Sequence, residues 1–272
     1  MSSTIHTFVA NLPLALATTV AWVRVAFVVG RLVKRHATID VFWGSGFVVV
    51  FGESLLHAHL GSHHHLSSLQ WASFAMVALW GARLAGYLAW RQRGSAEDPR
   101  YVWIMKGARG KNETVYALAK IYLFQAVLMW FISFPLQYIA ASATPLVGAL
   151  VIVGIAVSLV GLGFEAIGDS QLRAFLANPA NKGTTLNSGL WAYTRHPNYF
   201  GDSVVWWGIY LVAIATGGGV FTIASPLLMT WLLTSLSGKP MLEKKLTKTR
   251  AGYDDYVATV SGFIPRPPRP RR

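Results

Sequence analysis

The chain lacks cysteine altogether and carries little charge for its length. Only 13% of its 272 residues are charged, whereas 53% are hydrophobic, and a soluble globular protein usually has about 25% charged residues. The absence of cysteine excludes disulfides, thiolate metal sites and a cysteine nucleophile. No linker, low-complexity stretch or internal repeat divides the chain, so we expect one domain over residues 1–272.

Long apolar runs are present instead. About 20 apolar residues cross a bilayer as a helix, and the chain has seven such runs, at residues 7–30, 39–60, 69–90, 115–139, 144–165, 199–216 and 220–236. Because backbone groups in lipid must be satisfied internally, we expect all seven to be helices. The first run follows no basic segment and is interpreted as a retained helix, not a signal peptide. The sequence therefore predicts an all-α, polytopic integral membrane protein.

Basic residues are confined to alternate loops. Of the 24 Lys and Arg residues, three lie inside the expected spans (Arg24, Arg83 and Lys120), and the other 21 follow spans one, three, five and seven. This positive-inside pattern predicts an outer N-terminus and a cytoplasmic C-terminus, with His64 outside and Gly107 inside. Topology accounts for the net charge of +13, so we expect no nucleic-acid partner. The outer histidines are interpreted as incidental, and no metal site is predicted.

Polar side chains gather in two expected cytoplasmic loops, at residues 91–113 and 168–202. Long polar loops tend to carry function, and arginine beside Asn and Asp suits a ligand that has both phosphates and hydroxyls. Asn198 and Asp202 are spaced i, i+4 at the start of an apolar helix, so we expect both to point into the helix bundle. The alternative is that these residues are ordinary charge anchors and helix caps.

Glu53, Arg83 and Tyr87 lie inside expected spans, where an ionisable group is costly and suggests a function. A protonated Glu53 and the Tyr87 hydroxyl could both donate to one carbonyl oxygen. They would then stabilise the negative charge that forms on this oxygen when hydride attacks a double bond conjugated to the carbonyl group. The alternatives are that Glu53 is a buried partner of Arg83 and that Tyr87 is an interface aromatic.

The depths of Glu53 and Tyr87 argue against such a pair. At about 1.5 Å per residue, Glu53 lies roughly 20 Å from Asp40 at the inner face, and Tyr87 lies only about 6 Å from Arg91. The two side chains meet only if the third span continues past Arg91 or if the helices tilt strongly. We give more weight to the 34-residue spacing of Glu53 and Tyr87, which matches a family pattern described below, than to the expected ends of the spans.

Three stretches of the chain resemble the steroid 5α-reductase family, in its bacterial branch. They are WGARLAGYLAWRQRGSAEDPRY (80–101), SGLWAYTRHPNYFGD (188–202) and YDDYVATVSGFIPRPP (253–268). The second also resembles membrane sterol reductases, and isoprenylcysteine carboxyl methyltransferases share its RHP core. The family places a glutamate 34 residues before a tyrosine, and Glu53 and Tyr87 are 34 residues apart here.

This resemblance implies a seven-helix reductase that uses NADPH to reduce the C4–C5 double bond of 3-oxo-Δ4-steroids or a similar lipid enone. It implies that Glu53 and Tyr87 are catalytic and hold the ketone, with residues 1–110 on the substrate side and 111–272 on the cofactor side. The cofactor-binding residues that it implies are Arg100, Asp169, Arg173, Arg195, His196, Asn198, Tyr199 and Asp202. The chain departs from the family pattern at Gly52, where animal members have Gln, and at Leu176, where a basic residue is expected.

The function predicted from the sequence is that of a 3-oxo-5α-steroid 4-dehydrogenase. We expect a monomer in the bacterial cytoplasmic membrane, surrounded by lipid, with its cofactor side facing the cytoplasm. One alternative is a membrane methyltransferase that uses S-adenosylmethionine and needs neither Glu53 nor Tyr87. The other is a non-catalytic lipid or sterol binder, which needs no nucleotide.

Overall fold

The computed structural model describes residues 2–62, 65–142, 148–236, 243 and 246–270. These residues are largely helical, and their only β-type pairing is a bridge between Thr194 and Ser261. Six helical segments are long and apolar enough to cross a membrane: Ser3–Leu32, Thr38–Gly61, Ser68–Arg91, Glu113–Ile132, Ala149–Ala177 and Gly219–Leu236. The all-α prediction is confirmed, and the chain has the helices of an integral membrane protein.

The seventh expected span, 199–216, forms helix α9 (Pro197–Ala215). It is not among the six apolar helices of the described chain, because Asn198 and Asp202 in its first turns lower its mean hydropathy. A count of seven spans therefore stays a prediction, as does the orientation.

Two expected boundaries are wrong. The run 115–139 is not one helix, because α6 (Phe124–Ile132) ends at Ser133 and α7 (Phe134–Ala141) starts again with Pro135 in its first turn. Proline has no N–H to continue the preceding helix. Helix α8 (Ala149–Ala177) extends well past residue 165. Asp169 and Arg173 therefore lie on a helix and not in a loop.

The chain forms two compact units. The first contains the residues up to Val151 and Tyr210–Ser225, and the second contains Ile152–Ile209 and Pro226–Arg272. The first unit thus extends past residue 110, the boundary that the family resemblance implies between the substrate side and the cofactor side.

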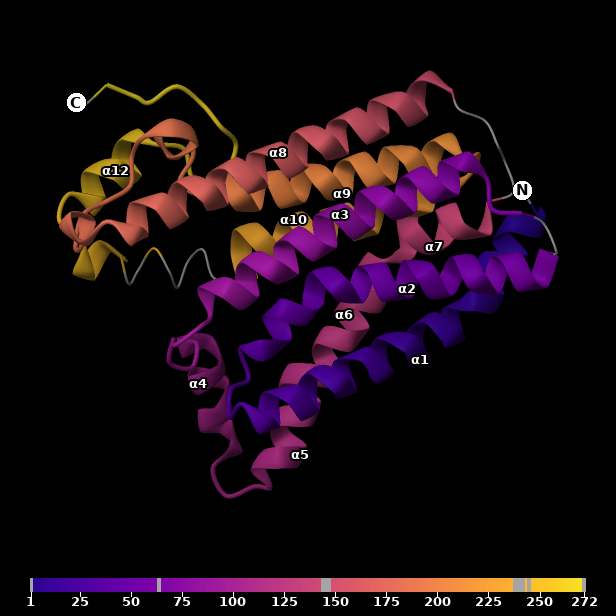
Figure 1. Ribbon diagram of the computed structural model, residues 1–272, viewed down its shortest axis with the longest axis horizontal. Helices are drawn as coiled ribbons and strands as arrows, with labels where there is room; N and C mark the ends of the chain where they lie inside the picture. Colours follow the sequence, from indigo (N-terminus) through magenta and orange to yellow (C-terminus); the bar gives the residue numbers. More distant parts are fainter. Residues whose placement is uncertain (1, 63–64, 143–147, 237–242, 244–245, 271–272) are drawn as a thin grey trace. The chain divides into compact units, whose positions relative to one another are not determined.

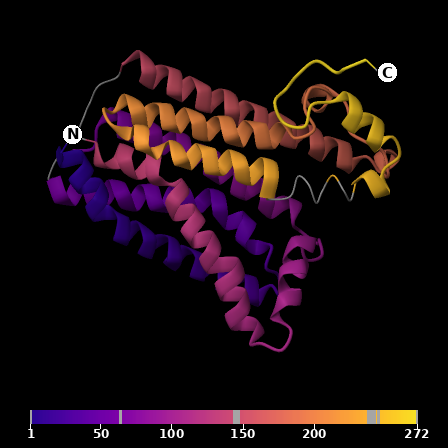
Figure 2. The same ribbon diagram turned by 180° about the vertical axis from the view of Figure 1, so that it is seen from behind.

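In the first unit, helices α1 (Ser2–Leu32), α2 (Thr38–Ser62) and α3 (Ser68–Arg91) follow one another as neighbouring antiparallel helices (Figures 1 and 2). The α2 and α3 backbones touch where Gly44 faces Gly81, since a Cβ on Gly44 would lie 2.6 Å from the Gly81 carbonyl oxygen. Only glycine permits so close an approach. Further along, Phe51 packs on Phe74 with ring centroids 5.9 Å apart. These contacts determine the register of the two helices.

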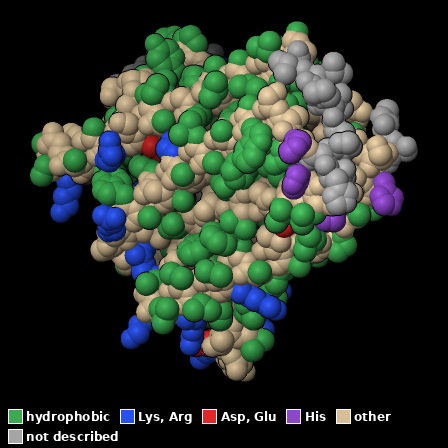
Figure 3. All heavy atoms as spheres, turned by 45° about the vertical axis from the view of Figure 1, so that its right-hand side comes forward, with side chains coloured by type: hydrophobic (Ala, Val, Ile, Leu, Met, Phe, Trp, Pro, Cys, Tyr) green, Lys and Arg blue, Asp and Glu red, His purple; other side chains and the backbone are tan. Residues whose placement is uncertain are grey.

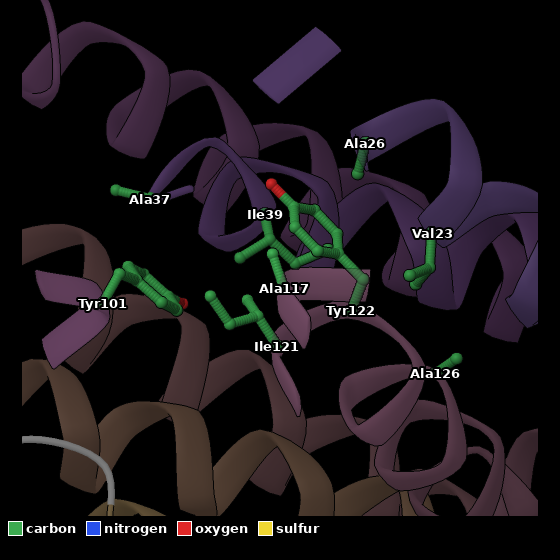
Figure 4. Packing of buried hydrophobic residues seen from close by; sticks show 9 residues of the cluster. All are labelled: Val23, Ala26, Ala37, Ile39, Tyr101, Ala117, Ile121, Tyr122 and Ala126. Atoms are coloured by element: carbon green, nitrogen blue, oxygen red, sulfur yellow. The ribbon is translucent and has the colours of Figure 1, made fainter. Parts of the chain in front are cut away.

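One end of the first unit has a dense apolar cluster that joins α1 and α2 to α4 (Pro99–Met105), α5 (Glu113–Ala117) and the π-helical turn η2 (Leu118–Leu123). Figure 4 shows the rings of Tyr101 and Tyr122 among smaller side chains of these elements. Tyr122 is fully buried and packs edge-on against Phe27, with ring centroids 5.0 Å apart. The 3₁₀ turn η1 (Lys106–Ala108) connects α4 to the segment before α5.

In the second unit, α8 and α9 also approach closely at glycines. A Cβ on Gly201 would lie 2.5 Å from the Gly161 carbonyl oxygen, and Gly208 faces Ser158 in the same way. Ser203 on α9 shares a 2.8 Å hydrogen bond with Thr230 on α10 (Ala224–Trp231). Other elements within the described residues are η3 (Pro179–Asn181), η4 (Gly189–Ala192), η5 (Gly219–Ile223), the π turn η6 (Leu232–Leu236) and α12 (Tyr253–Thr259).

The surface agrees with a chain surrounded by lipid. Figure 3 shows many hydrophobic side chains on the face that it presents. Many large apolar side chains are exposed, including Trp103 and Leu60 at 67% and 63%. An aqueous surface rarely carries so much contiguous apolar area.

The absence of native cysteine allows a direct test of orientation. His64 lies outside the described residues, so we choose His65, which is exposed after α2, and Lys106, which is exposed in η1. We expect a membrane-impermeant maleimide to label His65→Cys in intact cells and Lys106→Cys only after lysis, because the basic loops stay inside. Labelling of both cysteines from one side would contradict the alternating topology.

Candidate functional site

A half-buried ion pair joins α2 to α4 in the first unit. The Arg100 guanidinium lies 2.6 Å from an Asp40 carboxylate oxygen and 3.0 Å from one of Asp98, and the Tyr101 hydroxyl donates to Asp40 at 2.5 Å. Burial lowers the pKa of Arg100, but Asp40, Tyr101 and Asp98 together outweigh burial and raise the pKa above its usual value. A cofactor phosphate, the predicted partner of Arg100, would have to compete with two carboxylates.

Glu97 ties the segment after α3 to the start of α2. Its carboxylate accepts the backbone N–H groups of His36 and Ala37, the two residues that precede α2. Arg35 donates to the carbonyl oxygens of Gln92 and Ala96 in return. Part of the polarity in the 91–113 loop therefore holds the ends of α1, α2 and α3 together, as the anchor interpretation expected.

The structure does not bring Glu53 and Tyr87 together. Since Gly44 faces Gly81 and Gly52 faces Phe74 in antiparallel helices, Glu53 is level with a residue near position 72. Tyr87 lies about 15 residues further along α3, which is about 22 Å along the helix axis. The two side chains are too far apart to hold one carbonyl oxygen, so the depth argument agrees with the structure and the pairing inferred from the motif does not.

Tyr87 lies in the last turns of α3. Its half-buried ring is 5.8 Å from the Arg91 guanidinium and 6.0 Å from the ring of Trp90. Glu53 forms no ion pair within the described chain, so it is not the partner of Arg83, which is also far from it in this register.

Three carboxyl groups and one amide gather where α8 faces α9 in the second unit. Asp169 is 3% exposed and accepts a 3.2 Å hydrogen bond from the Asn198 side chain. Glu165 is 2% exposed and lies one turn before Asp169, against Gly201. Asn198 and Asp202, at i and i+4, share the face of α9 that the sequence predicted. The glycine contacts between α8 and α9 determine this arrangement.

Glu165 was missed as a site residue because it sits at the end of an expected span. Its spacing of four from Asp169 was the available signal, since two carboxyl groups at i and i+4 share one helix face.

The RHP run is occupied by contacts within the protein. Arg195 donates through Nε to Glu243 at 2.9 Å and through Nη1 to the carbonyl oxygens of Val257 and Val260 at 3.0 and 2.6 Å. His196 Nε2 lies 2.9 Å from the same carboxylate. Arg195 thus satisfies carbonyl groups at the C-terminal end of α12 that a helix leaves without partners.

Glu243 is the centre of this network, and the sequence pattern did not predict it. Burial raises its pKa, but hydrogen bonds from His196 and Arg195, together with the Arg195 charge, lower it to about 2. The signal in the sequence was weak, because Glu243 is one acidic residue next to a basic run, EKKLTKTR, after the last span.

The predicted cofactor residues therefore separate into groups. Asp169, Asn198 and Asp202 lie in or beside the α8–α9 carboxyl cluster, and Arg173 is exposed one turn beyond Asp169. His196 stacks on Tyr199, with ring centroids 5.2 Å apart and planes at 8°. Arg195 and His196 contact Glu243. Arg100 pairs with Asp40 and Asp98 in the first unit. The binding roles assigned to these residues stay predictions.

Comparison with known proteins gives a family and one distant relative. A family model described as "Protein of unknown function (DUF1295)" matches residues 26–260. A protein of Ustilaginoidea virens named "Probable O-methyltransferase ustE" is 28% identical over 110 residues, which cover 40% of this chain and 37% of that protein. The match thus spans little more than a third of that relative. No solved structure matches the chain.

Because of the Glu243 network, we expect the free energy of unfolding to depend on pH in the acidic range. Because the folded pKa of about 2 is below the ordinary value of 4.5, its contribution is complete above about pH 4.5 and is lost as the pH falls towards 2. We expect Glu243→Gln to destabilise the purified protein at pH 7 by on the order of 2–3 kcal/mol and to flatten this acid dependence in thermal melts. Glu113→Gln, at an exposed carboxylate, is the control; an unchanged acid profile in Glu243→Gln would contradict the role of the network.

Proposed function

Because the chain belongs to the DUF1295 family, whose description gives no function, we propose an activity from its own sites. We infer that it is a membrane reductase that binds NADPH on its second unit and reduces the conjugated double bond of a lipophilic enone. The observation that carries this proposal is the cluster of three carboxyl groups, those of Glu165, Asp169 and Asp202, with the Asn198 amide on α8 and α9.

The cluster fits the nicotinamide half of the cofactor. The Asp169 carboxylate can accept hydrogen bonds from ribose hydroxyls, and the Asn198 amide can both donate to and accept from a carboxamide. Arg173 lies at i+4 from Asp169 and is exposed, so a phosphate attached to that ribose would lie within its reach. NADPH supplies the hydride when it is bound.

We propose that Tyr87, and not Glu53, donates to the ketone. The charge pattern predicts that Tyr87, in the last turns of α3, lies near the cytoplasmic face, where a water-soluble cofactor enters. As hydride adds to the β-carbon, the double-bond electrons move to the ketone oxygen, and the Tyr87 hydroxyl stabilises that charge. The α-carbon then takes a proton from water.

The second candidate is an S-adenosylmethionine-dependent methyltransferase. It is favoured by the name of the Ustilaginoidea virens relative and by the negative charge that three carboxyl groups can carry, which suits a positively charged sulfonium. It needs neither Tyr87 nor a phosphate partner such as Arg173.

Ligand-induced stabilisation of the purified protein distinguishes these candidates. We expect NADPH to raise the melting temperature and S-adenosylmethionine to leave it unchanged, because a ligand that binds only the folded state stabilises it. Asn198→Ala and Asp202→Ala should remove most of the NADPH shift. Asp254→Ala, at an exposed carboxylate of α12, should keep it. A shift with S-adenosylmethionine alone would favour the methyltransferase, and no shift with either would favour the non-catalytic binder.

The separation of Glu53 from Tyr87 predicts unequal effects on turnover. With a 3-oxo-Δ4-steroid such as progesterone, Tyr87→Phe should lower kcat by about 10²–10³-fold, the usual loss for one oxyanion donor. Glu53→Gln should not share this loss, and neither change should weaken NADPH binding. Equal large losses in both variants would show that one oxygen is held by both groups and would contradict the α2–α3 register.

A further inference from the structure

Asn11, Ser54 and Glu53 form a polar cluster on α1 and α2 that the proposed reaction does not use. Asn11 and Ser54 are each 2% exposed, and the Asn11 amide donates to the Ser54 hydroxyl at 2.9 Å. Asn11 lies about 14 Å from the first residue of α1 along its axis. The cluster is therefore well inside a helix that is long enough to cross a bilayer.

The cluster is short of hydrogen-bond donors. Ser54 gives its only hydrogen to the Val50 carbonyl oxygen at 2.8 Å, so its 3.4 Å contact with Glu53 Oε2 supplies none. Glu53 Oε1 and Asn11 Oδ1 are both buried without a hydrogen bond in the described chain. The Asn11 side chain also hydrogen-bonds the Glu53 carboxyl group, but this contact leaves Glu53 Oε1 and Asn11 Oδ1 without a donor among the described residues. A buried acceptor without a partner costs about 1–3 kcal/mol.

The cluster is also short of positive charge. The described Lys, Arg and His side chains form no ion pair with Glu53. A carboxylate inside the membrane usually pairs with another group, because leaving it alone is costly. A ketone brings neither a donor nor a charge, so it does not complete this site.

The cluster can be reached from the lipid. Glu53 is only half-buried, and Leu56 and Leu60 follow it at i+3 and i+7 on the same side of α2. These two leucines are 56% and 63% exposed. A molecule dissolved among lipid chains can therefore approach Glu53 along this side of the helix.

We propose that Glu53 and Asn11 form a binding site for the protonated primary amine of a lipid-soluble amphiphile. The ammonium group donates one hydrogen to Glu53 Oε1 and one to Asn11 Oδ1, and its charge neutralises the carboxylate. The apolar tail lies along Leu56 and Leu60. This site does not depend on which cofactor the second unit binds.

The test uses the full-length protein in nonionic detergent and three probes with the same tail: dodecylamine, dodecanol and dodecyltrimethylammonium. We expect only dodecylamine to raise the melting temperature saturably, since it alone combines charge with N–H donors. Glu53→Gln, which keeps the shape, should weaken its binding at least about tenfold, because hydrogen bonds to charged groups contribute more than neutral ones. Glu113→Gln, at an exposed carboxylate, should bind as the wild type does.

Three results would overturn the proposal. If dodecyltrimethylammonium stabilises the protein as much as dodecylamine does, the site attracts positive charge and does not need N–H donors. An unchanged affinity in Glu53→Gln would place the amine elsewhere. The absence of any dodecylamine shift, with Glu53→Gln more stable than the wild type, would show that Glu53 is simply a protonated buried carboxyl group. Asn11→Asp, which keeps the size and adds acceptor charge, should tighten amine binding and tests the second partner separately.

Discussion

The close contact of the α2 and α3 backbones at Gly44 and Gly81 determines where the polar groups of the first unit lie. A side chain at either position would collide with the facing backbone, so the two helices can slide little past one another. That register places Glu53 far from the end of α3 that carries Tyr87 and Arg91. It also leaves Glu53 beside Ser54 on α2 and Asn11 on α1. The chemistry open to each residue follows from this one contact.

A similar constraint acts in the second unit, with a different result. Gly161 and Gly201 let α8 and α9 touch, and the same approach brings Asp169 within 3.2 Å of Asn198. Here the contact gathers polar residues that are far apart in the sequence. Close helix packing through glycine therefore separates one expected pair in the first unit and assembles a carboxyl cluster in the second.

The sequence predicted the helices well because each apolar run is bounded by polar residues, and the first three spans differ from α1, α2 and α3 by a few residues. It did not predict the break at Ser133, because the apolar run continues through Phe134 and Pro135 and this proline is its only helix-breaking residue. It extended α8 too little, because polarity at Asp169 looked like the start of a loop. A spacing of 34 residues could not place Glu53 against Tyr87, since the distance across two antiparallel helices depends on where their register is set.

The roles of polar residues were hardest to read, because a membrane protein with short loops uses many of them to hold its helix ends together. Arg100, Glu97, Arg195 and Glu243 all face protein partners. The side chains gathered at the α8–α9 contact are mainly carboxyls, and carboxylates repel a phosphate. Any dinucleotide must therefore place its uncharged or cationic ring and ribose near Asp169 and Asn198 and its phosphates further out, beyond the turn that carries Arg173. This charge distribution limits the orientation of the dinucleotide proposed above.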